Sequence, residues 1–315
     1  MKLIIQIPCK NEAAYLPTVL SQLPSTLPGI ETIEILVIDD GSTDATSEVA
    51  KTHGVQHILK FATNRWLGSA FARGVDYALT QGADILINTD ADDQYPGRYV
   101  ADLVAPIVAG RADIVIGDRN PGRVAHFSRY KRLLQRLGNQ VMRFFTWVTI
   151  PDAVSGFRAY SRESLETLHV TVRFSYVIDT ILQAYKKWLA IVRVPITINP
   201  PTRPSRLFKN IRVHIQKSAI SIIRIYTMYE PFRIFFLACL PFLLIWFAGI
   251  VRFLYYYRIM DEGTGKIQSL IISGVLVMIG FNFLSLGIIG DVIAKNRVLI
   301  EENLRITKQR YLTKE

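Results

Sequence analysis

Short apolar runs alternate with amphipathic segments over roughly the first 200 residues. The apolar runs are LIIQI at 3–7, IEILVI at 33–38, ILIN at 85–88 and IVIG at 114–117. Segments with helical periodicity lie between them, at 13–23, 43–53, 67–81 and 96–109. Continuous apolar strands that alternate with helices predict an α/β domain with a mostly parallel sheet covered on both faces.

Two long runs without charged residues follow in the last third of the chain. Residues 234–251 form a run of eighteen and residues 267–290 a run of twenty-four. Each is long enough to cross about 30 Å of hydrocarbon as a helix. The alternative, a pair of buried core helices, needs more surrounding protein than residues 291–315 supply. We therefore predict two transmembrane helices within 231–294.

The charge of the chain indicates how these helices are oriented. The 315 residues include 37 Lys+Arg and 26 Asp+Glu, and half of the residues are hydrophobic, which excludes a disordered or collagen-like chain. The flanking cations are Arg203, Arg206, Lys209, Arg212, Lys217, Arg224 and Arg233 before the first run, and Lys295, Arg297, Arg305, Lys308, Arg310 and Lys314 after the second. The connector at 252–266 is far less biased. Because such cations stay on the cytoplasmic side, we expect a cytoplasmic-membrane protein whose large N-terminal domain and both termini are cytosolic.

A proline-rich stretch at 195–204 is expected to end the globular domain. Cations then recur about every third residue from 206, and apolar residues occupy a different stripe of the same helix. This pattern favours an amphipathic helix on an anionic membrane surface, with a plain solvated basic face as the alternative. The predicted division is a domain at 1–204, juxtamembrane helices at 205–230, membrane helices at 231–294 and a basic tail at 295–315.

Polar residues cluster where three of the predicted strands end. The clusters are Pro8 to Glu12, Asp39 to Ser42 and Asp90 to Gln94. Ligands of such sheets bind beyond the carboxyl ends of the strands. Asp90 and Asp92 bracket Ala91, so both carboxylates can reach one point, and Gln94 adds an amide oxygen. Hard oxygen ligands of this kind suit Mg²⁺ or Mn²⁺.

The run from Asp39 to Asp44 has two interpretations that the sequence leaves open. Its carboxylates can accept hydrogen bonds from ribose hydroxyls or base edges, but Asp, Ser and Thr are also common at helix starts. Other nucleotide and hydrolase signatures are missing. The G-x-G-x-x-G fingerprint, the Walker lysine loop and the G-x-S-x-G elbow do not occur in the chain.

Six segments together resemble a known family. They are IPCKNE, VIDDGSTDAT, NRWLGSAFARG, NTDADDQYP, GDR and SGFRAYSR, and the resemblance covers about residues 3–206. The set is similar to family 2 glycosyltransferases of GT-A fold, specifically the polyprenyl-phosphate group that includes dolichol-phosphate mannose synthases and bacterial undecaprenyl-phosphate glucosyltransferases. The resemblance implies a GT-A (nucleotide-diphospho-sugar transferase) domain that moves a sugar, with inversion, from a GDP- or UDP-linked donor to a polyprenyl phosphate. It implies Mg²⁺ or Mn²⁺ as cofactor and a lipid bilayer as partner, and bacterial relatives suggest a homo-tetramer.

The same resemblance implies roles for individual residues. The nucleotide sugar would be bound by Pro8, Asn11, Glu12, Asp39, Asp40, Asp90 and Ala91, and the metal by Asp90, Asp92 and Gln94. The catalytic centre would contain Asp92, Arg119, Arg158 and Asp152, and the acceptor phosphate would be bound by Arg203, Ser205, Arg206 and Lys209.

Two segments depart from the family's pattern. The run PPTRPSRL at 200–207 differs from the family's R-x-x-G-x-[ST]-K-L. The segment at 155–158 lacks an aspartate that some relatives carry and that has been proposed as a base, for which Asp152 and Asp179 are the nearest candidates in sequence.

Two other functions compete with this one. A polymerising polysaccharide synthase of the same family would carry a Q-x-x-R-W signature, which the sequence lacks. A membrane-tethered binding protein without enzymatic activity, for nucleic acid, would explain the net charge of +11. The cations that flank the apolar runs already account for that charge, and a stacking-aromatic RNA motif is absent, so we expect no nucleic-acid partner.

Overall fold

The computed structural model of the protein describes residues 1–119, 155–170, 176–200, 226–258 and 267–312, with the single positions 152, 220 and 224. The chain divides into two compact units. One contains Met1–Ser218 with Leu304–Glu315, and the other contains Ala219–Asn303.

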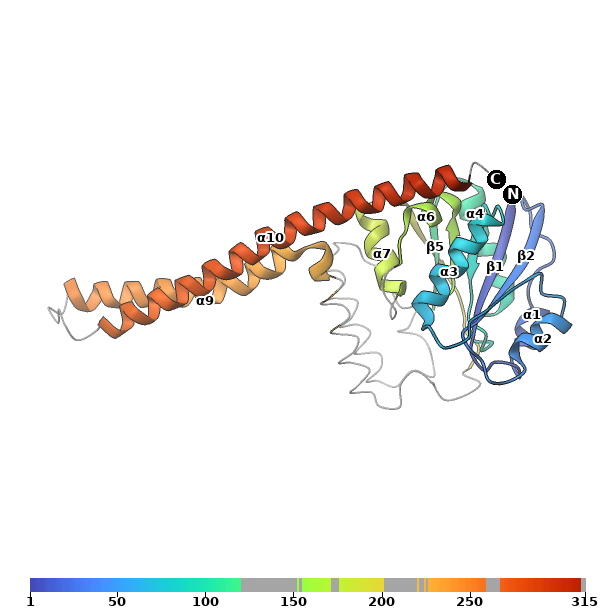
Figure 1. Ribbon diagram of the computed structural model, residues 1–315, viewed down its shortest axis with the longest axis horizontal. Helices are drawn as coiled ribbons and strands as arrows, with labels where there is room; N and C mark the ends of the chain where they lie inside the picture. Colours follow the sequence, from blue (N-terminus) through green and yellow to red (C-terminus); the bar gives the residue numbers. More distant parts are fainter. Residues whose placement is uncertain are drawn as a thin grey trace. The chain divides into compact units, whose positions relative to one another are not determined.

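The first unit is built on a seven-stranded mixed sheet. Its strands are β1 (Lys2–Cys9), β2 (Thr32–Asp39), β3 (His57–Lys60), β4 (Ile85–Asn88), β5 (Ile114–Asp118), β6 (Arg158–Ser161) and β7 (Ile191–Pro195). They lie in the order β3-β2-β1-β4-β6-β5-β7, and only β6 runs antiparallel to its neighbours. The paired strands β1 and β2 lie side by side in Figure 1. The mostly parallel sheet and the four strands expected from apolar runs are confirmed.

Helices cover both faces of this sheet. They are α1 (Leu16–Ser21), α2 (Thr46–Thr52), α3 (Leu67–Thr80), α4 (Val100–Val108), α6 (Arg162–Thr167) and α7 (Tyr176–Lys186), with a 3₁₀ turn η1 (Gly97–Tyr99). Alternate side chains of β1, Leu3, Ile5 and Ile7, are fully buried in one core with residues of α1 and α4. On the other face α3 packs closely, because a Cβ at Gly74 would lie 2.2 Å from Oε1 of Gln6. Both faces are therefore buried, as continuous apolar strands require.

The second unit contains α9 (Pro231–Arg258) and most of α10 (Ile267–Leu312). Small residues lie where these helices approach each other. An added Cβ at Gly249 would contact Ser273, one at Gly280 would contact Leu243, and one at Gly287 would contact Phe235. The partners run in opposite directions along the chain, so the two helices are antiparallel and pack through small residues. Large apolar side chains on the outer surface stay about two-thirds exposed, among them Leu244, Met278 and Phe281. Both helices are long and apolar enough to cross a membrane.

Candidate active site

The carboxyl ends of β2, β1 and β4 lie side by side at one edge of the sheet. Pro8 pairs with Ile38 and Cys9 pairs with Asp39, so the first two strands end level with each other. β4 ends at Asn88 beside β1, immediately before the Asp90 turn. The structure thus brings all three predicted polar clusters to one edge, as the rule for ligand sites in such sheets requires.

Asp39 and Asp40 shape the turn that follows β2. Asp39 is fully buried; its Oδ1 accepts from the amide of Ser42 at 2.7 Å, and its Oδ2 accepts from the hydroxyl of Ser47. Oδ1 of Asp40 accepts from the amide of Arg65 at 2.6 Å. These hydrogen bonds hold the turn that precedes α2, whose N-cap residue is Ala45 and carries no capping side chain. Contact with a nucleotide stays a prediction.

Asn11 and Glu12 join the loop after β1 to the same turn. The amide of Asn11 donates to Oγ of Ser42 at 2.9 Å, and Oδ1 of Asn11 accepts from the amide of Thr43 at 2.8 Å. The amide of Glu12 donates to Oγ1 of Thr46 at 2.9 Å, and the Glu12 side chain is buried. These hydrogen bonds join the loop after β1 to the turn after β2.

Asp90, Asp92 and Gln94 lie together in the turn after β4. Oδ2 of Asp92 accepts from Nε2 of Gln94 at 2.9 Å. Burial, and then the neighbouring charge of Asp92, raise the pKa of Asp90 to about 7, although the guanidinium of Arg119 opposes the rise. A carboxylate pair that resists carrying two charges fits a divalent cation, which would neutralise both.

The rest of such a metal shell would come from elsewhere. Among the residues that the structure describes, no group of three or more His, Cys, Asp or Glu side chains is gathered around one point. Mg²⁺ typically takes one or two carboxylates and completes its shell with substrate phosphates and water. Asp90, Asp92 and the amide of Gln94 match that donor set.

The raised pKa of Asp90 predicts a pH-dependent gain in stability for Asp90→Asn. Unfolded, this carboxyl ionises near its ordinary value, so from about pH 4 to about pH 7 the native state retains a proton that the unfolded state loses, and stability falls with rising pH. Asparagine has no carboxyl to ionise, so the variant does not lose stability in this way as the pH rises. In metal-free protein with chelator we expect the variant to be at least about 1 kcal/mol more stable at pH 8, a rise of roughly 2–4 °C in apparent Tm.

Thermal unfolding in detergent at pH 8 and pH 5 checks this prediction. The advantage of Asp90→Asn should shrink toward pH 5. Asp93→Asn serves as the control, because Asp93 lies in the same turn but accepts from Nε2 of Gln22 on its outside, and its substitution should not reproduce the gain at pH 8. Equal gains at both pH values would contradict the assigned cause.

Arg119 and Asp152 form a bidentate ion pair just beyond β5. Nε of Arg119 donates to Oδ2 of Asp152 at 2.6 Å, and Nη2 donates to Oδ1 at 2.7 Å. Asp152 is almost fully buried, and its Oδ2 also accepts from the amide of Arg119 at 3.1 Å. Both carboxylate oxygens are thus engaged by one guanidinium. This geometry favours a carboxylate that holds Arg119 in place over one that accepts a proton from substrate.

Arg158 is fully buried at the start of β6. Its Nε donates to the carbonyl of Ser155 at 2.8 Å, and its Nη1 donates to the carbonyl of Val177 at 2.8 Å and to Oγ1 of Thr180 at 3.1 Å. These bonds tie the 155–158 segment to α7. The geometry favours a supporting role for Arg158. The place in the catalytic centre that the resemblance implied for it stays a prediction.

Asn88 is a site-supporting residue that sequence reasoning missed. Its Oδ1 accepts from Nε2 of Gln6 at 2.9 Å, and its Nδ2 donates to the carbonyl of Gly156 at 2.9 Å and to the hydroxyl of Tyr176 at 3.0 Å. A Cβ at Gly156 would lie 3.4 Å from the carboxylate of Asp90. Asn88 thus holds the 155–158 segment against the Asp90 turn. The signal in the sequence was a polar residue closing the apolar run ILIN.

The predicted acceptor site lies outside the described residues. It comprises Arg203, Ser205, Arg206 and Lys209, within the unassigned range 201–219. The same holds for most of the juxtamembrane helix predicted at 205–230.

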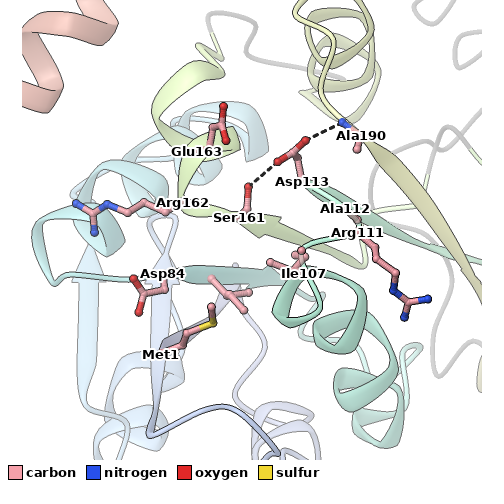
Figure 2. A pocket seen from close by; sticks show the side chains of 12 residues that line it. Met1, Asp84, Ile107, Arg111, Ala112, Asp113, Ser161, Arg162, Glu163 and Ala190 are labelled. Atoms are coloured by element: carbon pink, nitrogen blue, oxygen red, sulfur yellow. Dashed lines mark hydrogen bonds between the residues drawn. The ribbon is translucent and has the colours of Figure 1, made fainter.

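A pocket of about 420 Å³ lies at the opposite edge of the sheet (Figure 2). Met1, Asp84 and Asp113 line it, and each directly precedes a strand. Asp113 accepts from the hydroxyl of Ser161 and from the amide of Ala190, as the dashed lines in Figure 2 show. These bonds hold the segments where strands begin. Because the lining residues precede the strands, the pocket is separate from the site at the carboxyl ends.

A sequence profile for Glycosyl transferase family 2 matches residues 4–168. The chain belongs to this family. The polyprenol monophosphomannose synthase of Mycolicibacterium smegmatis is 31% identical over 205 residues, which cover 62% of this chain and 76% of that protein. The undecaprenyl-phosphate mannosyltransferase of Micrococcus luteus is 27% identical over 207 residues, 62% of this chain and 83% of that protein. The family assignment from motifs is confirmed.

Solved structures of this fold include glucosyl-3-phosphoglycerate synthase from Mycobacterium tuberculosis. Its complex with Mg²⁺ and UDP aligns with a TM-score of 0.54 at 20% identity, over 70% of this chain and 78% of that chain. Its complex with Mn²⁺ and UDP-glucose aligns with a TM-score of 0.54 at 21% identity, over 70% of this chain and 77% of that chain. At this identity the likeness shows a shared fold, and it confirms the predicted GT-A class.

Proposed function

We propose that this family 2 glycosyltransferase transfers a sugar from a GDP- or UDP-linked donor to a polyprenyl phosphate at the cytoplasmic face of a membrane. The proposal rests on one observation. Asp90, Asp92 and Arg119 lie near one another at the carboxyl edge of the sheet, in a chain that also has two helices long enough to cross a membrane. The names of the two relatives, both transferases acting on polyprenyl-type lipids, support the choice of acceptor.

The donor would bind at the edge formed by the Asp39, Asn11 and Asp90 segments. Asp90, Asp92 and Gln94 would hold Mg²⁺ or Mn²⁺, and a divalent cation bound there would neutralise the departing diphosphate. Arg119 contributes a fixed positive charge close enough to Asp90 to limit the rise in the pKa of that carboxyl. The bidentate pair with Asp152 keeps this guanidinium in position, so little reorganisation is needed as negative charge develops.

The acceptor requires no protein base. The second pKa of a phosphate monoester is near 6, so the attacking oxygen is already largely anionic at about pH 7. The involvement of both Asp152 oxygens with Arg119 agrees with such a mechanism. The protein then has to align the phosphate with the anomeric carbon opposite the leaving nucleotide, and a single displacement gives inversion.

Membrane attachment brings the soluble domain to a lipid-borne substrate. A polyprenyl phosphate keeps its charged group at headgroup level, and α9 with α10 would anchor the chain there. Basic residues at 203–224 would attract the phosphate and anionic lipids, each by about 1 kcal/mol near the surface. Surface attraction alone gives reversible binding, whereas two spanning helices retain the enzyme.

Transfer by the full chain in detergent tests the proposal. Purified protein with Mn²⁺ is given a panel of radiolabelled GDP- and UDP-sugars and a polyprenyl phosphate, with the unphosphorylated polyprenol as matched control. We expect one donor class to label the polyprenyl phosphate once and the polyprenol not at all. Extension of soluble glycans into polymer would favour a polysaccharide synthase, and labelling of neither lipid with any donor would overturn the proposal.

A further inference from the structure

Trp66 occupies a backbone conformation that residues with side chains rarely adopt. Its φ is 72° and its ψ is 152°, a region populated almost entirely by glycine. The indole is 52% exposed, so burial offsets little of the strain. Strained residues persist where the surrounding structure holds them, and they concentrate at functional sites.

The residues around Trp66 are fastened to the turn that follows β2. The amide of Arg65 donates to Oδ1 of Asp40 at 2.6 Å, and the amide of Trp66 donates to Oδ1 of Asn64 at 2.8 Å. The backbone at Thr63 and Asn64 packs against Gly41, where an added Cβ would lie 2.8 Å from the Asn64 nitrogen. Trp66 therefore lies beside the Asp39–Gly41 turn, at the carboxyl edge of the sheet.

The groups around Trp66 limit the kind of ligand that its indole can contact. Asp40 places a carboxylate beside this segment, since its Oδ1 accepts from the amide of Arg65, and a carboxylate disfavours a phosphate or an anionic headgroup next to it. A neutral heterocycle with N–H donors suits the carboxylate, and its flat face suits the indole. We infer that Trp66 stacks on the nucleobase of the donor, an inference that rests on the proposed function. Stacking on aromatic side chains is tolerant of base identity, so either a UDP- or a GDP-sugar can use it.

Nucleotide binding by Trp66→Gly tests this inference. Glycine adopts positive φ freely, so the variant should unfold at the same temperature as the wild type or higher. Its dissociation constant for UDP or GDP, measured by calorimetry on the full chain in detergent with Mn²⁺, should rise roughly 5- to 100-fold. Trp66→Phe keeps a ring and should stay within a few-fold of the wild type.

Trp188 supplies a matched control. It also has positive φ, at 58°, and its indole is 92% exposed, but it precedes β7 at the opposite edge of the sheet. Trp188→Gly should leave nucleotide affinity unchanged. Wild-type affinity in Trp66→Gly would overturn the inference, as would an unchanged nucleotide affinity combined with a raised KM for polyprenyl phosphate. If the wild type itself binds neither UDP nor GDP, the proposed function fails and the inference falls with it.

Discussion

Asp92→Ala is expected to lower the rate of sugar transfer roughly 100- to 1,000-fold, the usual effect of removing one preorganised electrostatic group from an active site. The substitution removes one of the two carboxylates proposed to hold the divalent cation, and Gln94 loses the partner that its Nε2 contacts at 2.9 Å. Initial rates with saturating donor and acceptor measure the effect. The thermal stabilisation that Mn²⁺ gives the wild type should shrink in parallel, because a ligand stabilises only the state that binds it.

Asp93→Asn is the matched control for this substitution. Asp93 is the next residue in the chain, but its carboxylate accepts from Gln22 at 2.8 Å, and its φ of 58° is one that asparagine tolerates. The control should retain most of the transfer activity and the full response to Mn²⁺. Full activity in Asp92→Ala, or the same loss in both variants, would show that the metal assignment is wrong.

The sheet could be predicted because its central strands are buried on both faces. Runs such as LIIQI and ILIN hold one polar residue each and do not alternate polar with apolar positions, and the structure places them in neighbouring parallel strands. β6 escaped prediction because it reads RAYS, four residues without an apolar run, and the arginine is buried with hydrogen bonds to the carbonyls of Ser155 and Val177. Its antiparallel pairing with β4 and β5 depends on those tertiary contacts, which local pattern does not contain.

The positions of the site residues could be predicted more readily than their partners. Strand ends and spacing were sufficient to bring the Asp39 and Asp90 segments to one edge. The partners of Arg119 and Arg158 depended on residues 33 and 19 positions away in the chain, which no spacing rule connects. Trp66 lies within the motif NRWLGSAFARG, but its backbone strain is a property of φ and ψ that exists only once the chain is folded.

The ion pair of Arg119 and Asp152 gives the second large expected effect. Arg119→Ala removes the charge next to the Asp90 turn and should lower kcat roughly 100- to 1,000-fold. Asp152→Asn keeps one oxygen for the guanidinium but loses the bidentate geometry, so we expect a smaller loss, about 10-fold in kcat. If Asp152 acts only by holding Arg119, the double variant should be no slower than Arg119→Ala alone, because residues that act through one contact are not additive.

A double-mutant cycle in kcat therefore separates the two roles of Asp152. A base that acts on the acceptor independently of Arg119 would multiply the two losses, and the double variant would fall about a further 10-fold below Arg119→Ala. The stabilisation of each variant by Mn²⁺ serves as the check on folding, since Asp90, Asp92 and Gln94 are unchanged in all of them. Non-additive losses with an intact Mn²⁺ response would place the chemistry in charge neutralisation and alignment, with the acceptor phosphate supplying its own nucleophile.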